Sequence, residues 1–140
     1  MTAQTVSDDV RRLLGQHIES YEQLEIVLLL HRTRDVQWTA EAVGRSLNIR
    51  DAEAAGALAT MQRRQIISVA PEPDGSVRYA YAPSSPADAA AVDQLAEAYA
   101  TQRIEIMKLM NANAMLRVRT GALRVFADAF DLRKGPKNNG

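Results

Sequence analysis

The sequence predicts a mostly α-helical chain that carries one small β-hairpin and a long helical extension after the hairpin. Between Val36 and Pro83, two short helical segments surround a tight turn and precede two β-prone runs joined by a Pro/Gly turn. After Pro86, a stretch rich in Ala, Leu, Met and Gln contains no Gly or Pro until Gly121. The order of these segments, rather than any single motif, predicts the fold.

Two amphipathic helices are expected before the central region. Ser7 can cap the first helix, whose apolar side chains recur at helical spacing: Val10, Leu13, Leu14, His17 and Ile18. Ser20 and Gln23 form a capping-box pattern at the start of the second helix. This second helix is apolar over most of its circumference, which predicts burial from more than one side. We therefore take residues 1–19 as an N-terminal helix that covers the next unit.

The central region begins with Val36-Gln37-Trp38, whose alternation favours a short, half-buried strand. Thr39 can cap a short helix, and Asn48 suits a left-handed cap at the end of that helix. Asp51 is expected to cap the following helix, which extends to about Arg64.

Two strands follow these short helices. β-branched residues at Ile66–Val69 begin the first strand, and Ser76–Tyr81 alternates as the second strand requires. Pro71–Gly75 supplies the turn chemistry between them, and Pro83–Pro86 closes the unit. A short strand, two helices and a hairpin in this order are typical of a winged helix-turn-helix domain, here residues 20–83.

A family resemblance becomes specific at this point. Trp38-Thr39-Ala40-Glu41-Ala42-Val43 and Leu47-Asn48-Ile49, followed by Asp51–Arg64 and the hairpin, resemble the winged-helix domain of MarR-like and ArsR-like bacterial regulators. The resemblance implies that Asp51–Arg64 is the recognition helix and that Pro71–Ser76 is the tip of the wing. Gln65 stands where such domains usually have Gly before the first wing strand.

Residues 84–132 are expected to form C-terminal helices that dimerise or pack on the N-terminal helices. Ala87–Met115 can form one long helix, capped by Ser84 or Ser85, with apolar residues at spacings close to a heptad. Because a long helix beyond a small unit needs cover, this pattern predicts a homodimer through Val92, Leu95, Tyr99, Ile106 and Met110.

The long helix is expected to end before the C-terminus of the chain. Thr120-Gly121 predicts a break, and a short amphipathic helix with Leu123, Phe126 and Phe130 on one face follows it. Residues 133–140 are polar and basic, which predicts a disordered tail.

Composition bounds the class of protein. The chain has 140 residues, 17 basic and 17 acidic side chains, and no Cys. No apolar run is long enough to predict a transmembrane helix, and the N-terminus lacks the pattern of a signal peptide. The absence of Cys excludes disulfide and thiol chemistry. We expect a cytoplasmic bacterial protein.

The residue patterns that catalysis or metal binding requires are missing from the sequence. His17 and His31 fall on the apolar sides of predicted helices, without Cys or acidic residues at metal-site spacing. Gly44 and Gly56 stand alone inside predicted helices, so no phosphate-binding loop is formed. No serine lies in a nucleophile-elbow pattern. We expect no enzyme, no metal site and no cofactor.

The candidate nucleic-acid-binding residues are the cations of the central region: Arg45, Arg50, Arg63, Arg64 and Arg78. The same region carries an equal number of acids, which are Glu41, Asp51, Glu53, Glu72 and Asp74, so its net charge is zero. Affinity for duplex DNA depends mostly on neutralised phosphates, so this balance weakens the expectation of DNA binding. An acid at the start of a recognition helix suits only a cytosine amino group.

Two hypotheses follow, because a fold alone does not decide function. The first is a dimeric winged-helix transcriptional regulator that binds double-stranded DNA, which the resemblance favours. The second is a winged helix used as a protein–protein interaction module without DNA binding, which the charge balance favours. A protein partner would then contact Asp51–Arg64 or Leu123–Phe130.

The segment Arg117–Lys137 is the most basic part of the chain. We interpret it first as a terminal helix that docks onto its own core with a solvated charged face. The alternatives are a helix that docks on a partner, a contact to the DNA backbone, or weak attraction to an anionic membrane.

Overall fold

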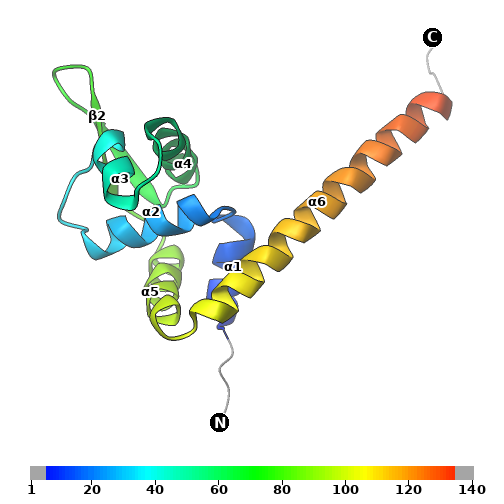
Figure 1. Cartoon of the computed structure of the whole chain (residues 1–140), viewed down its shortest axis with the longest axis horizontal. Coiled ribbons are helices and arrows are strands. Elements are labelled where there is room, and N and C mark those ends of the chain that lie inside the picture. The colour runs from blue at the N-terminus through cyan, green and yellow to red at the C-terminus, as the bar shows by residue number, and fades with distance from the viewer. Residues whose placement is uncertain (1–5, 135–140) are drawn as a thin grey trace.

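The computed structural model describes residues 6–134, with side chains described for residues 6–130. Its elements follow one another as labelled in Figure 1: α1 (Asp8–Gln16), α2 (Tyr21–Arg32), α3 (Ala40–Leu47), α4 (Asp51–Arg63), β1 (Ile67–Pro71), β2 (Val77–Tyr81), α5 (Pro86–Thr101) and α6 (Arg103–Lys134). This order confirms the predicted class, a mostly α-helical chain with one hairpin and a long helical extension at its C-terminal side.

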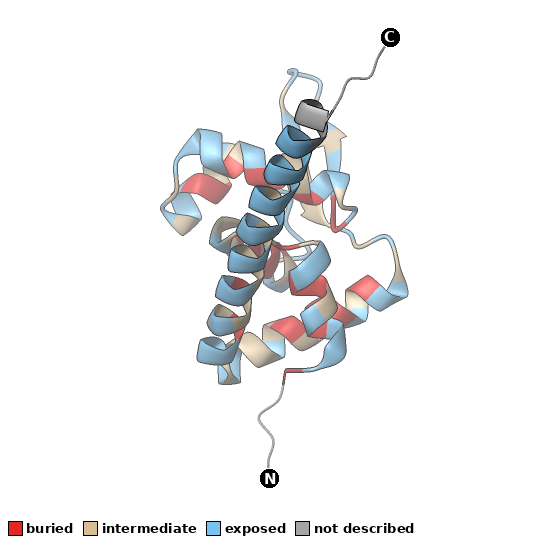
Figure 2. Ribbon diagram, turned by 90° about the vertical axis from the view of Figure 1, so that its right-hand side faces the viewer, coloured by how far each residue is buried: buried red, intermediate tan, exposed pale blue. Residues whose placement is uncertain are grey.

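The hydrophobic core lies in the body formed by α1 to α5 and the first turns of α6. α1 packs on α5 and α6, while α2 packs on α4 and also contacts α3, α5 and β2. In α2, Leu24 and the whole run Ile26–Leu30 are buried, which confirms that this helix is covered from more than one side. Figure 2 shows the buried residues gathered in this body, whereas most of α6 is exposed.

Local hydrogen bonds explain where most helices begin. Ser7, Ser20, Thr39 and Ser85 each accept a hydrogen bond from the backbone N–H three residues later, as N-caps do. The capping box expected at Ser20 is displaced by one residue, because the Gln23 side chain accepts from the backbone of Glu19 at 2.7 Å.

The start of α4 differs by one residue from the prediction. Arg50, not Asp51, is the N-cap residue, and it makes no side-chain cap. Glu53 compensates, because its carboxylate accepts a hydrogen bond from the backbone N–H of Arg50 at 3.4 Å.

The turn between α3 and α4 depends on close packing of the backbone. Asn48 adopts the predicted left-handed conformation, with φ 59° and ψ 47°. The N–H of Ile49 then donates to the carbonyl of Gly44 at 2.9 Å. A Cβ atom on Gly44 would lie only 2.9 Å from the carbonyl oxygen of Ile49, so this position requires glycine.

The hairpin forms the wing. β1 and β2 pair antiparallel with Val69 opposite Tyr79, and the tip turns at Gly75, whose φ is +90°. Trp38 exchanges two backbone hydrogen bonds with Tyr79, at 2.8 and 2.7 Å, which confirms the short strand expected before α3 as a single bridge. Gln65 adopts a φ of +66°, the left-handed conformation that explains why related domains favour Gly before this strand.

The predicted single helix Ala87–Met115 is wrong, because the chain breaks at Gln102 into α5 and α6. Gln102 has φ −133° and ψ 43°, outside the helical region. The turn lets α6 pack on α1 and α5, where Ile106 and Met110 are buried. No Gly or Pro marks this break, so burial of apolar side chains outweighs the helix propensity of the segment.

The predicted break at Thr120-Gly121 is also wrong, because α6 continues to Lys134. A helical Gly costs only about 1 kcal/mol, which is too little to end a helix of strong helix formers. Arg133 and Lys134 therefore belong to α6 and not to the predicted tail, whose remaining residues 135–140 lie outside the described residues.

The outer part of α6 projects from the body (Figure 1). Leu123 and Phe126 are 63% and 69% exposed, so the interpretation that this segment docks onto its own core is wrong. What the sequence presents as a terminal helix is a projecting continuation of α6.

The residues predicted to line a dimer interface lie inside the single chain. Val92, Leu95 and Ile106 are fully buried, and Met110 is 9% exposed. Tyr99 is partly buried, and its hydroxyl hydrogen-bonds that of Tyr21 on α2 at 3.0 Å. Because α1 and α2 of the same chain already provide the cover, these positions do not offer an exposed surface to a second copy.

Candidate nucleic-acid interface

α4 presents a smooth outer face made of small side chains. Its buried residues, Ala54, Ala57, Leu58 and Met61, face the body. Helical periodicity places Ala52, Gly56 and Ala59 on the opposite side, together with the exposed Arg63. The three small residues have no side-chain group that hydrogen-bonds a base edge, although an alanine methyl group can contact the methyl group of thymine. This face therefore permits close approach and offers little direct readout.

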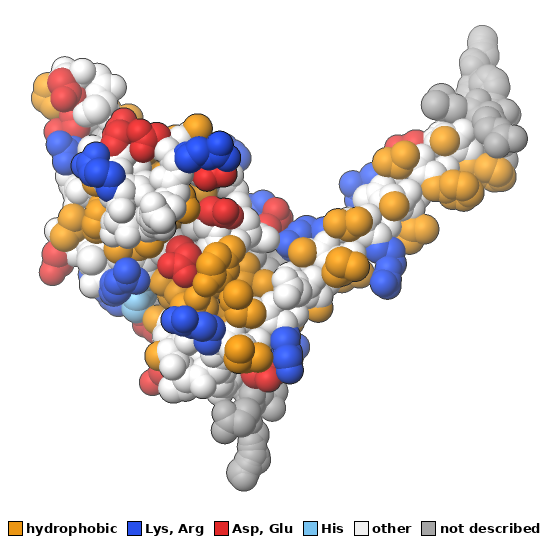
Figure 3. Space-filling model, viewed as in Figure 1, with side chains coloured by type: hydrophobic (Ala, Val, Ile, Leu, Met, Phe, Trp, Pro, Cys, Tyr) orange, Lys and Arg blue, Asp and Glu red, His pale blue; other side chains and the backbone are white. Residues whose placement is uncertain are grey.

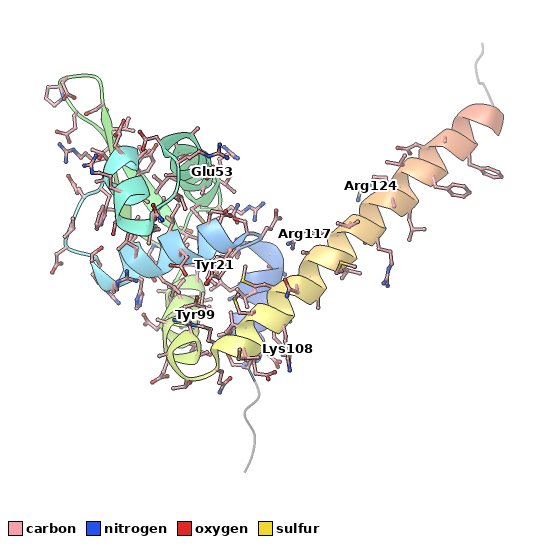
Figure 4. The ribbon with its side chains drawn as sticks, viewed as in Figure 1. Tyr21, Glu53, Tyr99, Lys108, Arg117 and Arg124 are labelled. Atoms are coloured by element: carbon pink, nitrogen blue, oxygen red, sulfur yellow. The ribbon has the colours of Figure 1, made fainter. Side chains whose placement is uncertain are left out.

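The leading end of α4 carries an exposed ion pair. Arg50 Nη2 donates to Glu53 Oε2 at 3.0 Å, and the two side chains are 84% and 43% exposed. The hydrogen bonds and the positive charge of Arg50 hold the pKa of Glu53 below its ordinary value. Because solvent screens such a pair, a phosphate can compete with Glu53 for the guanidinium group. Figure 4 labels Glu53 on α4.

Arg64, just after α4, is held by its own chain. Its Nη1 donates to the carbonyls of Gln16 and His17, at 3.3 and 2.9 Å, and its Nη2 donates to Glu19 Oε2 at 3.1 Å. The side chain is 27% exposed. The structure therefore gives this candidate cation a role in joining α4 to the α1–α2 connection, which the sequence did not indicate.

The other candidate cations are spread over three elements. Arg45 is exposed in the last turn of α3, and Arg63 is exposed at the end of α4, where its Nη2 donates to Thr60. Arg78 lies on β2 beside the wing tip. The structure brings these cations to the α3–α4–wing side of the body, and Figure 3 shows basic and acidic side chains intermixed there.

The wing tip itself is acidic and tightly built. Asp74 Oδ1 accepts hydrogen bonds from the Ser76 hydroxyl at 2.6 Å and from the Ser76 backbone at 3.0 Å. These bonds, with a smaller contribution from the charge of Arg78, hold the pKa of Asp74 below its ordinary value. The carboxylate therefore stays charged at neutral pH, next to one of the candidate DNA-binding cations.

Sequence reasoning missed a cavity between α2 and the α5–α6 junction. It has a volume of about 640 Å³, and its walls include Glu25, His31, Tyr99 and Arg103. Tyr99 donates to Glu25 at 3.3 Å, and the Arg103 guanidinium lies 4.6 Å from the centre of the Tyr99 ring. The only signal in the sequence was Arg103, which interrupts the apolar heptad pattern. The other wall of the cavity is α2, which lies far from Arg103 in the chain, so the sequence did not show that the two face each other.

Two other classes of site are absent from the described part of the chain. Between residues 6 and 134, no helix is both long enough and apolar enough to cross a membrane. Among the side chains described, those of residues 6–130, no group of three or more His, Cys, Asp or Glu is placed to bind a metal ion.

Solved structures share this arrangement over most of their length. The MarR family transcription regulator SP03579 is 22% identical, with a TM-score of 0.50 over 87% of this chain and 81% of that chain. The heme sensor protein PefR from Streptococcus agalactiae, in complex with heme, is 15% identical, with a TM-score of 0.52 over 87% and 82%.

A third similar structure is that of a mutant of S. aureus MepR bound to an oligodeoxyribonucleotide, which is 9% identical, with a TM-score of 0.50 over 86% of this chain and 90% of that chain. No family model matches the chain, and no curated protein matches its sequence. At these identities the likeness shows the fold, which is the winged-helix fold of MarR-family transcription regulators. The structures compared are those of regulators and a sensor, not of enzymes.

Proposed function

We propose that the chain is a dimeric transcriptional regulator that binds double-stranded DNA through α4 and the wing. The observation that carries the proposal is the smooth outer face of α4, bordered by cations on α3, α4 and β2. The MepR structure supports it, because a protein of the same fold is bound there to an oligodeoxyribonucleotide. Small side chains on α4 let the helix approach the floor of a major groove closely.

The proposed contacts are Arg45, Arg50, Arg63 and Arg78. Arg64 is left out because its guanidinium already bonds two carbonyls and a carboxylate of its own chain. Four cations in each of two chains make eight, which falls within the roughly 6–10 phosphate contacts of typical DNA-binding proteins. The affinity then comes mainly from the phosphates, and the sequence preference is weak because α4 offers few groups to the base edges.

A fluorescence-anisotropy titration with random duplex DNA at low and moderate salt tests the proposal. We expect micromolar binding that weakens steeply with salt, as non-specific DNA binding does. Replacing Arg45, Arg63 or Arg78 by Ala is expected to reduce the slope of log affinity against log salt by about 0.9 for each phosphate that the variant no longer neutralises. R64A is the matched control, and its slope should equal that of the unaltered protein. No binding at low salt would overturn the proposal.

A protein-interaction module is the second candidate function. The observation that favours it is that acids offset the cations of the same surface, where Glu53 pairs with Arg50 and Asp74 lies near Arg78. On this alternative the smooth face of α4 receives a protein, and the anisotropy titration shows no salt-sensitive binding. A pull-down with the unaltered chain and with A59R, which places a long side chain on that face, would then identify whether α4 is the contact.

A further inference from the structure

The short connection between α1 and α2 is held by arginines from two distant parts of the chain. Arg64, which follows α4, donates from Nη1 to the carbonyls of Gln16 and His17 and from Nη2 to the carboxylate of Glu19 at 3.1 Å. Arg117 on α6 donates from Nη2 to the backbone carbonyl of Glu19 at 3.0 Å. Glu19 is therefore bonded both to the residue that ends α4 and to α6.

These bonds fix the backbone and the side chain of Glu19 together. Its backbone N–H donates to Gln23 Oε1 at 2.7 Å, in the first turn of α2. Its carbonyl accepts from Arg117 and its carboxylate accepts from Arg64, so three elements are joined at one residue. Both arginine bonds are charge-assisted, which makes them stronger than hydrogen bonds between neutral groups. A displacement of the Glu19 carbonyl therefore moves the carboxylate that Arg64 binds.

Arg64 transmits such a displacement to α4. It is the C-cap residue of this helix, and its backbone N–H donates to the carbonyl of Thr60 at 3.0 Å. Because its guanidinium also bonds the end of α1, Arg64 holds the C-terminal end of α4 against the α1–α2 connection. Arg63, one residue earlier, is a proposed phosphate contact. The position of that cation therefore depends on the bonds that Arg64 makes.

Arg117 differs from the neighbouring arginines of α6. It is partly buried, whereas Arg119 and Arg124 are exposed. Figure 4 labels Arg117 where α6 passes the body and Arg124 farther out along the helix. Replacement by Ala removes the same charge at each of the three positions, but at Arg117 it also removes the bond to Glu19.

We infer that Arg117 is a positioning residue for DNA binding, which acts through Glu19 and Arg64 on the C-terminal end of α4. The inference rests on the proposed function, which assigns α4 to DNA. The coupling passes through a continuous chain of hydrogen bonds from α6 to α4. Because Arg117 acts through two other residues, its loss lowers the affinity without removing a phosphate contact.

Anisotropy titrations of the full-length chain with random duplex DNA at several salt concentrations test the inference. We expect R117A to bind about three- to tenfold more weakly, with the salt slope of the unaltered protein. R117K should restore most of the affinity, because an ammonium group can also donate to the Glu19 carbonyl. The matched controls R119A and R124A should bind as tightly as the unaltered protein. An equal loss in these controls, or a reduced slope in R117A, would overturn the inference.

A double-mutant cycle tests whether Arg117 acts through Arg64. If it does, R117A causes no further loss of affinity in the R64A background, so the double variant binds as R64A does. Losses that multiply would show that the two arginines act separately, and the inference would then be overturned. Thermal melts of the same variants establish that the body stays folded during the titrations.

Hydrogen exchange supplies a readout that does not depend on DNA. The N–H groups of residues 64–66 donate to carbonyls of the last turns of α4. We expect them to exchange several-fold faster in R117A and R64A than in the unaltered protein, and R124A to leave them unchanged. If this pattern holds but the unaltered chain binds no DNA, the proposed function fails while the link from α6 to α4 is supported. Unchanged exchange in R117A would refute the link whatever the titrations show.

Discussion

At the scale of single residues, Glu53 decides how much of Arg50 is available to a phosphate. Replacing Glu53 by Gln removes the negative charge but keeps the shape of the side chain. We expect E53Q to bind duplex DNA more tightly, with a salt slope close to that of the unaltered protein, because Arg50 then contacts its phosphate without first giving up its ion pair. Anisotropy titrations at several salt concentrations measure both quantities.

The matched control for this prediction is E41Q, which removes an exposed acid from the first turn of α3. A general effect of net charge would strengthen binding equally in both variants. If E53Q and E41Q behave alike, the specific competition between Glu53 and a phosphate for Arg50 is refuted.

Tyr81 is expected to make the stability of the fold depend on pH above pH 10. Its hydroxyl oxygen is buried and has no hydrogen-bond partner among the described residues. Burial, aided by the charge of Asp93, raises the pKa of Tyr81 to about 12. Because this pKa lies above the ordinary value of about 10, the stability from the neutral phenol is complete below pH 10. That stability is lost as the pH rises from 10 through about 12.

We therefore expect the melting temperature of the unaltered protein to fall between pH 10 and 12 more than that of Y81F. Circular dichroism melts at intervals across this range measure the difference. Parallel declines of the two proteins would show that Tyr81 ionises as freely in the folded state as in the unfolded one.

At the scale of elements, the α3–α4 turn depends on one glycine. We expect G44A to lower the free energy of unfolding by about 1–3 kcal/mol, because the new methyl group would press on the carbonyl of Ile49. G56A is the matched control in α4, where no described atom lies within 4 Å of the added Cβ apart from chain neighbours and the helix's own backbone. That variant should gain up to about 1 kcal/mol from better helix propensity. Urea unfolding compares the two, and equal effects would contradict the packing argument.

The elements that the sequence predicts well are those set by neighbours in the chain. Ser7, Thr39 and Ser85 cap helices through bonds to the third residue onward, so their roles are visible in a short window. The break at Gln102 and the continuation through Gly121 depend instead on whether the body covers the helix at that point. No local pattern contains that information.

Some features of the candidate interface could likewise be predicted from the sequence, and others could not. The sequence predicts α4, the wing and the candidate cations. Its equal numbers of acidic and basic residues in this region agree with the intermixed charges on the surface. It does not reveal that Arg64 reaches back to Gln16, His17 and Glu19, since these partners lie in a different helix connection. It also assigns Val92 and Leu95 to an interface, because apolar periodicity identifies a buried face without identifying what buries it.

At the scale of the whole molecule, the chain consists of a packed body and the projecting outer part of α6, residues 115–134, which we call the arm. The core ends near Met110, and the exposed apolar side chains of α6 beyond it begin at Met115. The winged-helix unit and the arm therefore have separate sources of stability. Because Leu123 is 63% exposed, we expect L123R to leave the melting temperature of the body unchanged, and light scattering on the same variant measures whether the arm contributes to the proposed dimer.

The helicity of the projecting arm is expected to depend on the concentration of the protein. An isolated helix of the arm's length is marginal in water, because each helical turn costs chain entropy that packing normally offsets. We expect the ellipticity of the unaltered chain to decrease on dilution, whereas L123R should show the lower value at every concentration. A constant ellipticity for the unaltered chain would mean that the arm holds its helix alone.

If the ellipticity does fall, the arm is frayed and accessible to proteases at low protein concentration, whereas association covers it at high concentration. Degradation would then remove single chains faster than paired ones, and the steady-state amount of the protein would depend on its own concentration.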